Sequence, residues 1–141
     1  MKDTLRPGLT HTMRYTMPDN RTVPHLLPES PGFATMPEVL ATGYMVGILE
    51  WACVEAIQDH LDPGDLTLGT HVDLSHEAPT VPGSTITVDV RVVEVEGRSL
   101  VFEVEARDEH AVISRGAHRR GVVDRGRFDD RIARQAEETR P

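Results

Sequence analysis

The sequence predicts a domain of the α+β class, in which one long helix is wrapped by an antiparallel sheet. Three observations support this prediction: one apolar run at 39–58 that is long enough for a buried helix, four extended segments after it, and very short connections between those segments. Strands with short connections are antiparallel neighbours. At 141 residues the chain fits one compact domain with room for a sizeable core.

The long helix is expected to begin near Thr35 and to end at Leu61. Thr35 and Glu38 have the spacing of a capping box, and a proline falls in the first turn. A Pro-Gly pair after Leu61 then stops the helix. Residues 1–36 contain five prolines, so we expect a long N-terminal loop region with one strand at 10–17.

Four extended segments follow the helix, at residues 68–76, 84–96, 99–108 and 111–123. In the second segment apolar and polar residues alternate up to Val92, and the apolar phase then shifts to Val93 and Val95. Such a shift indicates a β-bulge or a second buried face, which would be a dimer interface. One strand, a long helix and four more strands form the pattern of a hotdog fold.

We expect residues 1–123 to form the hotdog domain and residues 124–141 to form a charged tail, either a solvated helix or a frayed end. With 23 acidic and 15 basic residues, the chain is not expected to bind nucleic acid or an anionic membrane. Its single cysteine, Cys53, cannot form an intramolecular disulfide and is expected to be a buried small side chain. No secretory signal or membrane span is recognised, so a cytoplasmic location is the expectation.

Glu50 is the most informative residue, because its neighbours at helical spacing are all small or apolar. Burying a carboxylate in such a segment costs free energy because its hydration is lost, so a carboxylate found there is expected to have an ionic partner or a functional role. His76 shares a strand phase with Val72 and Leu74, so it is expected to point toward the helix. A carboxylate and an imidazole that meet in an apolar pocket can perform general acid–base chemistry near neutral pH.

Two stretches, VPHLLPESPGFATMPEVLATGYMVGILEWACVEAI and LGTHVDLSHEAPTVPG, resemble the fluoroacetyl-CoA thioesterase family of hotdog hydrolases. The similarity extends over residues 22–120. It implies hydrolysis of a small acyl-CoA thioester without a cofactor, by a chain that forms at least a homodimer. The site residues that it implies are a catalytic set of Thr42, Glu50 and His76, a glycine whose backbone contacts the substrate (Gly69), acyl-pocket positions Val23, Leu26 and Phe33, and a pocket arginine, Arg120.

The sequence departs from the family at the aromatic lid position, which is Met36 here, and at a nearby aromatic position, which is Leu40. In the family the aromatic lid closes over the fluoromethyl group. Methionine is flexible and fills irregular space less selectively. We therefore expect a broader or different acyl preference.

The three catalytic candidates also have structural interpretations. Glu50 can be paired with Arg120, His76 can be a satisfied core histidine, and Thr42 can be a helix N-cap. On one straight helix Thr42 and Glu50 would lie ~12 Å apart along the axis and about 80° apart around it. Either the helix begins at Thr42, or the two residues serve opposite ends of the substrate or different subunits.

Two other functions stay open at this level: an acyl-thioester dehydratase or hydratase, and a non-catalytic acyl-CoA-binding module. The absence of an Asp-x-Asn-Pro-x-His pattern counts against the first. His71 and His76 are expected to face opposite ways on a strand, so no metal site is predicted. Arg115, Arg119 and Arg120 are the best candidates for a patch that binds the phosphates of coenzyme A.

Overall fold

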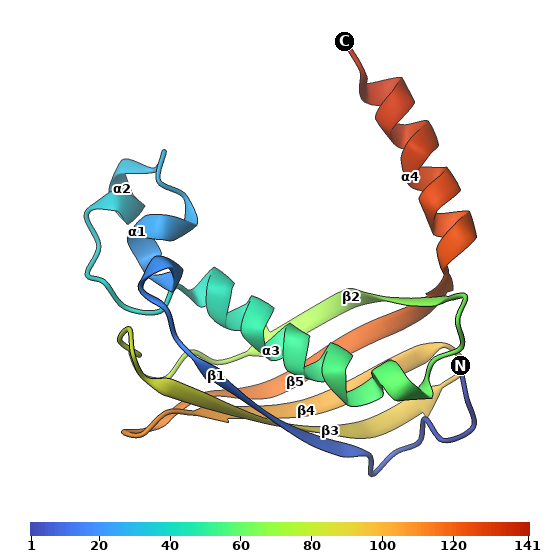
Figure 1. Cartoon of the computed structure of the whole chain (residues 1–141), viewed down its shortest axis with the longest axis horizontal. Helices are drawn as coiled ribbons and strands as arrows, with labels where there is room; N and C mark the ends of the chain where they lie inside the picture. The colour runs from blue at the N-terminus through green and yellow to red at the C-terminus, as the bar shows by residue number, and fades with distance from the viewer.

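A curved, five-stranded antiparallel sheet wraps around one long helix in the computed structural model, which describes residues 1–141 (Figure 1). The sheet order is β1-β3-β4-β5-β2, so β1 and β2 are its edges. This arrangement confirms the predicted α+β architecture. The central elements are α3 (Thr42–Ile57), β1 (Thr10–Thr16), β2 (Asp65–Leu74), β3 (Thr85–Glu96), β4 (Ser99–Arg107) and β5 (Val112–Asp124).

Short helices lie within the connections on either side of α3. The segment between β1 and α3 contains η1 (Asp19–Arg21), α1 (Val23–Leu26) and α2 (Pro31–Ala34), and η2 (Gln58–His60) continues from the end of α3. The expected strand at 10–17 is confirmed, but the N-terminal region has more regular structure than a loop. At the other end, α4 (Arg125–Thr139) follows β5.

The predicted start of the long helix near Thr35 is wrong, because α3 begins seven residues later, at Thr42. Thr35 ends α2 instead, and its hydroxyl donates to the carbonyl of Pro31. Hydrogen bonds with other segments hold the residues just before α3 outside a helix: Leu40 donates to the carbonyl of Thr80, and the carbonyl of Val39 accepts from Val23. These contacts with distant segments outweigh the local capping pattern. The N-cap of α3 is Ala41, so Thr42 is the first helical residue rather than the cap.

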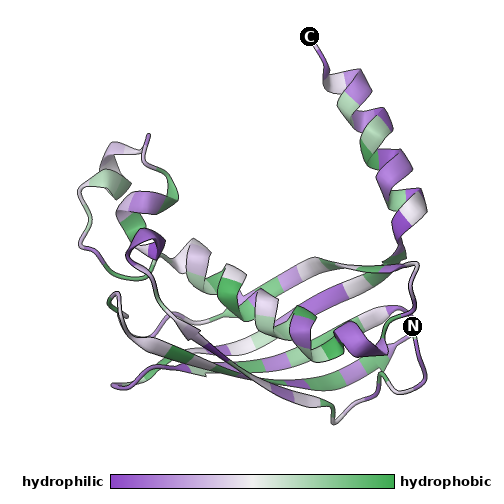
Figure 2. Cartoon of the chain, in the orientation of Figure 1, coloured by the Kyte–Doolittle hydropathy of each residue, from purple (hydrophilic) through white to green (hydrophobic).

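The core lies between one face of α3 and the concave face of the sheet. Figure 2 shows apolar positions recurring along the helix and alternating with polar ones along the strands. Cys53 is part of this core, as expected, and burial raises the pKa of its thiol to about 12. A thiol that stays protonated at neutral pH is not a nucleophile. The side chains that α3 buries are Met45, Ile48, Leu49, Ala52, Cys53 and Ile57.

Two β-bulges adjust the register of the sheet. One lies between Val92 and Glu94 in the β3–β4 pairing, where the apolar phase of the sequence shifts, so the bulge interpretation of that shift is confirmed. The other lies between Gly69 and His71 in the β2–β5 pairing and has no signal in the apolar pattern. This second bulge changes the direction of an edge strand close to the middle of α3.

Helix α4 projects away from the sheet and buries none of its residues (Figure 1). Its N-cap is Asp124, whose carboxylate accepts a hydrogen bond from the backbone N–H of Arg127 at 2.9 Å. Of the two expectations for residues 124–141, the solvated helix is the one observed. No helix of the structure combines the length and the apolar character needed to cross a membrane.

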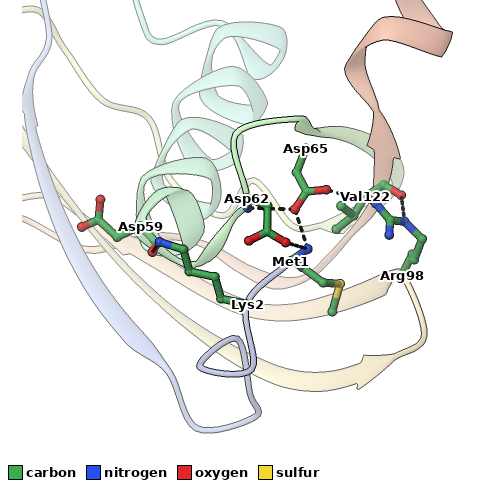
Figure 3. Close-up of polar contacts among 7 residues, drawn as sticks. All are labelled: Met1, Lys2, Asp59, Asp62, Asp65, Arg98 and Val122. Atoms are coloured by element: carbon green, nitrogen blue, oxygen red, sulfur yellow. Dashed lines mark hydrogen bonds and ion pairs between the residues drawn. The ribbon is translucent and has the colours of Figure 1, made fainter.

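Ion pairs connect the N-terminal segment to the start of β2 (Figure 3). The ammonium group of Met1 lies 2.8 Å from Oδ2 of Asp62 and 2.6 Å from Oδ2 of Asp65. The other oxygen of Asp65 accepts from Arg98 at 3.1 Å. The hydrogen bond from the Met1 ammonium, followed by one from the backbone of Asp62, holds the pKa of Asp65 below its ordinary value.

The lowered pKa predicts a pH-dependent loss of stability for Asp65→Asn. A carboxyl group with a depressed pKa stabilises the fold above its ordinary pKa of 3.8, and this stabilisation disappears as the pH falls through the folded-state value. We expect the variant to melt a few degrees lower at pH 7, with the difference shrinking below about pH 4. Thermal melts from pH 3 to pH 8 measure it, with Asp59→Asn as control because the Asp59 carboxylate has no partner. A difference that does not change with pH would contradict the assignment.

Candidate active site

An apolar pocket of about 430 Å³ lies at the N-terminal end of α3. The three positions that the resemblance places near the acyl group line it, and so does the residue at the lid position. The first turn of α3 completes the wall. The lining residues are Val23, Leu26, Gly32, Phe33, Met36, Ala41, Thr42 and Gly43.

Local packing shapes this pocket. A Cβ atom at Gly43 would lie 2.9 Å from Cδ2 of Leu26, so the glycine lets α1 pack closely against α3. The buried hydroxyl of Thr22 pairs with Nδ1 of His25 at 2.8 Å and fixes the start of α1. The side chain of Met36 is 47% exposed, so the lid position stands at the open side of the pocket. The pocket therefore has fixed walls and one flexible edge.

Thr42 and His76 form a hydrogen-bonded pair at this pocket, with 2.8 Å between Oγ1 and Nδ1. His76 lies just beyond the end of β2, where Ser75 and Glu77 bond to the backbone of β5. Partial burial is the main cause that lowers the pKa of His76 from 6.5, so its imidazole is neutral at pH 7. The structure therefore brings together two of the three predicted catalytic residues.

The strand phase used to place His76 is only partly correct. His76 does meet the helix, at Thr42, but Val72 is 48% exposed rather than turned to the core. The bulge after Gly69 and the end of β2 at Leu74 interrupt the simple alternation. A glycine inside a strand can mark a bulge, and Gly69 does so here, so the period-two alternation does not carry through this strand.

Glu50 is not paired with His76 but with Arg120, with 2.6 Å between Oε2 and Nη1. The expectation that Glu50 is buried is wrong for this chain, because its side chain is 41% exposed. Helix α3 is apolar nearly all round, yet the sheet covers only one face, and Val46 and Gly47 flank Glu50 on the open side. The second carboxylate oxygen, Oε1, makes no hydrogen bond with the protein.

Arg120 is held from the sheet side by groups that leave its guanidinium little freedom. It is only 5% exposed. Its Nε donates to the hydroxyl of Thr67 at 3.0 Å, and its Nη2 donates to the carbonyl of Thr67 at 2.8 Å. Because a buried guanidinium needs an anion and several acceptors, the Glu50 carboxylate is held next to β5.

Gly69 leaves the space that this ion pair needs. A Cβ atom at position 69 would lie 2.6 Å from Oε2 of Glu50 and 3.5 Å from Nη1 of Arg120. Such a contact is too short for any other residue without displacing the carboxylate. Among the predicted residues, Gly69 and Arg120 therefore lie with Glu50, and not with the acyl pocket of the same chain.

Sequence reasoning missed His118, which lies beside this ion pair and is 3% exposed. Its Nε2 is 3.2 Å from Nη1 of Arg120 and 3.9 Å from Oε2 of Glu50. The ring stacks on Phe102, with 6.3 Å between centroids. The signal was available, because residues two apart on a strand share a face and His118 precedes Arg120 by two.

The three arginines expected to form one basic patch do not do so. Arg120 points inward, whereas Arg119 is exposed on the opposite face of β5. Arg115 pairs with Glu77 at 3.1 Å. Strand alternation separates neighbouring side chains, so charges adjacent in sequence do not add on one surface.

Two side-chain pairs thus lie along one helix. Thr42 and His76 stand at the acyl pocket, whereas Glu50 and Arg120 stand eight residues further on, ~12 Å along the helix axis. The expectation that Thr42 and Glu50 do not bond directly is confirmed.

Comparison with known proteins identifies the same family as the sequence resemblance. A family model described as fluoroacetyl-CoA-specific thioesterase matches residues 26–126. A fluoroacetyl-CoA thioesterase from Streptantibioticus cattleyicolor is 46% identical over 132 residues, which cover 94% of this chain and 95% of that protein. A solved structure of a fluoroacetyl-CoA thioesterase is 42% identical with a TM-score of 0.91, covering 99% of this chain and 100% of its own.

A more distant structure supports the fold alone. A thioesterase superfamily member from Thermus thermophilus has a TM-score of 0.83 at 24% identity, over 95% of each chain. The matches at higher identity cover nearly the whole chain and favour a thioester hydrolase over a hydratase or a binding module. The chain is a thioesterase with the hotdog fold, and it belongs to the fluoroacetyl-CoA-specific thioesterase family.

Proposed function

We propose that this chain hydrolyses a small acyl-CoA thioester to the free acid and coenzyme A, with Thr42, Glu50 and His76 as the catalytic residues. The observation that carries the proposal is an apolar pocket lined in part by Thr42, whose hydroxyl forms a hydrogen bond with His76. The enzyme would act as a cytoplasmic homodimer without a cofactor. Residues 1–123 would form the catalytic domain, with 124–141 as an appendage.

The acyl group would enter the pocket lined by Val23, Leu26, Phe33 and Met36, which places the thioester carbonyl next to Thr42. The N-terminus of α3 lacks a side-chain cap, so backbone N–H groups of its first turn are available there. These groups and the helix dipole favour negative charge. They can therefore stabilise the oxyanion that forms when the carbonyl is attacked.

Glu50 and His76 would divide the chemistry. The free Oε1 of Glu50 either attacks the thioester carbonyl or removes a proton from a water that does so. If Glu50 activates water, the proton that it takes from the water passes through His76 to the sulfur of coenzyme A as the C–S bond breaks. If Glu50 attacks, the C–S bond breaks to leave a mixed anhydride on Glu50 and the thiolate of coenzyme A, and a water then hydrolyses the anhydride while His76 passes a proton of that water to the thiolate. Thr42 orients the neutral imidazole through its 2.8 Å hydrogen bond.

A second copy of the chain would complete the site. Within one chain Glu50 cannot reach the carbonyl next to Thr42, because the two residues lie ~12 Å apart on α3. Edge strand β2 is unpaired on its outer side and carries Val72, which is 48% exposed. The open face of α3 carries Val46, Gly47 and Val54. An unpaired edge beside a small, apolar helix face favours pairing with another copy, which would bring one Glu50 to the other Thr42.

Met36 would set the acyl preference. Because methionine is flexible and half exposed here, it covers the pocket less tightly than an aromatic ring. Fluoroacetyl and acetyl groups differ by one atom, so discrimination between them needs a close contact. We expect acceptance of several small acyl groups.

Glu50→Gln should abolish most of the turnover. The amide can neither attack the thioester nor accept a proton, so we expect kcat to fall by ~10²- to 10⁴-fold. Release of free thiol from acetyl-, fluoroacetyl-, propionyl- and phenylacetyl-CoA measures it. Glu55→Gln is the matched control, since Glu55 lies one turn further along α3 and pairs with His11. No turnover of any substrate by the wild type, with binding intact, would overturn the hydrolase proposal in favour of a binding module.

Mixed dimers test whether the site is shared between copies. If each site takes Thr42 from one copy and Glu50 from the other, co-refolded Thr42→Ala and Glu50→Gln chains contain some intact sites. Random pairing then restores about a quarter of wild-type activity, although each variant alone is inactive. If one chain supplies both residues, every site carries a mutation and the mixture stays inactive.

Met36→Phe should sharpen the preference for fluoroacetyl-CoA over acetyl-CoA. A rigid ring at the open side of the pocket is expected to change the ratio of the two kcat/KM values by ~10- to 100-fold. Leu27→Phe adds a ring at an exposed neighbouring position outside the pocket and serves as the control. An unchanged ratio would mean that position 36 does not control selectivity in this chain.

A further inference from the structure

His118 has a fixed tautomer in this structure. Its Nδ1 lies 2.8 Å from the backbone carbonyl of His71, which can only accept a hydrogen bond. Nδ1 therefore carries the ring proton. The carbonyl belongs to β2 just after the bulge at Gly69, so the irregularity of that edge strand presents the acceptor to His118.

The other ring nitrogen consequently acts as an acceptor toward Arg120. With its proton on Nδ1, the neutral ring has a lone pair on Nε2, which lies 3.2 Å from Nη1 of Arg120. The same Nη1 donates to Oε2 of Glu50 at 2.6 Å. A continuous chain of hydrogen bonds thus runs from the His71 carbonyl through His118 and Arg120 to Glu50.

Together, these hydrogen bonds and the two contacts with Thr67 engage all three nitrogens of the Arg120 guanidinium. Thr67 holds the Nε and Nη2 side, and only His118 and Glu50 hold Nη1. Without an acceptor at His118, Nη1 keeps one hydrogen bond in place of two. The guanidinium could then rotate or shift toward the open face, taking the Glu50 carboxylate with it.

We propose that His118 is a positioning residue, which as a neutral imidazole fixes Arg120 and thereby holds Glu50 with Oε1 directed to the substrate. This inference rests on the proposed role of Glu50. Removing the acceptor at position 118 is predicted to lower kcat more than it raises KM, because His118 does not line the acyl pocket.

A purely structural role for His118 would need only its stacking on Phe102 and its burial. The hydrogen-bonding groups on both sides of the ring additionally require one particular tautomer, with the proton on Nδ1. Arg120 on β5 and Glu50 on α3 lie on its Nε2 side, the His71 carbonyl on β2 faces Nδ1, and Phe102 on β4 covers the ring. Burial lowers the pKa of His118. A protonated ring would lose its acceptor and place a positive charge next to Arg120.

Two substitutions separate the hydrogen bond from the stacking. His118→Gln can keep an acceptor near the Nε2 position, whereas His118→Phe keeps a ring on Phe102 and removes the acceptor. We expect His118→Phe to lower kcat by about 10- to 100-fold with a small change in KM, and His118→Gln to keep most of the activity. Phe102→Leu is the packing control, which should lower the melting temperature and leave kcat close to wild type.

Nitrogen chemical shifts of the histidine rings provide a readout that does not depend on turnover. The proposal requires the Nδ1–H tautomer for His118 at pH 7, and an Nε2–H tautomer or an imidazolium ring would overturn it. Full activity of folded His118→Phe beside an inactive Glu50→Gln would also overturn it and leave the proposed function standing. A wild type that hydrolyses no acyl-CoA would instead overturn the proposed function.

Discussion

The buried guanidinium of Arg120 is the constraint on which the rest of the site depends. Removing a guanidinium from water costs several kcal/mol unless an anion and hydrogen-bond acceptors replace the solvent. In this protein the acceptors come from Thr67 and His118, and the anion is Glu50. The absence of a side chain at Gly69 gives the carboxylate room to approach. One ionic contact therefore fixes the positions of residues from α3, β2 and β5.

The same contact holds the Glu50 carboxylate in place on an open helix face and leaves it one free oxygen, which the proposed reaction would use. Arg120 binds only Oε2 of Glu50, which leaves Oε1 without a protein partner. At the N-terminal end of α3, Thr42 lines an apolar pocket and bonds to His76, and Glu50 of the same chain does not reach this pocket. A rigid helix keeps the two pairs apart, so the proposed reaction needs a second copy to bring them to one carbonyl.

Sequence patterns were sufficient where structure depends on local periodicity. The four strands follow from alternation, whereas the phase shift after Val92 and the charged C-terminal residues each left two possibilities, of which the structure has the bulge and the solvated helix. The pocket positions came from the family resemblance, and the structure places Val23, Leu26 and Phe33 around one cavity. Strand and helix periods carry this information because they repeat every few residues.

Predictions failed where contacts with segments distant in sequence determine the local structure or the exposure of a side chain. The capping pattern at Thr35 is overridden by two hydrogen bonds with distant segments, in which Leu40 donates to the Thr80 carbonyl and Val23 donates to the Val39 carbonyl, and α3 begins only at Thr42. The exposure of Glu50 depends on which face of α3 the sheet covers, and an apolar helix does not reveal that. His118 shares a strand face with Arg120, which the sequence does indicate, but its hydrogen bond to the His71 carbonyl depends on the bulge in β2 and on the β2–β5 pairing, which strand alternation does not reveal.

The most direct test of a catalytic site that combines the two pairs is a crystal structure with a non-hydrolysable thioether analogue of an acyl-CoA. Our account predicts a dimer in which the acyl group fills the pocket next to Thr42 and His76 of one copy. Oε1 of Glu50 from the other copy would lie within about 3.5 Å of the carbonyl carbon. An analogue bound to a monomer, or with its carbonyl far from every Glu50, would contradict the account.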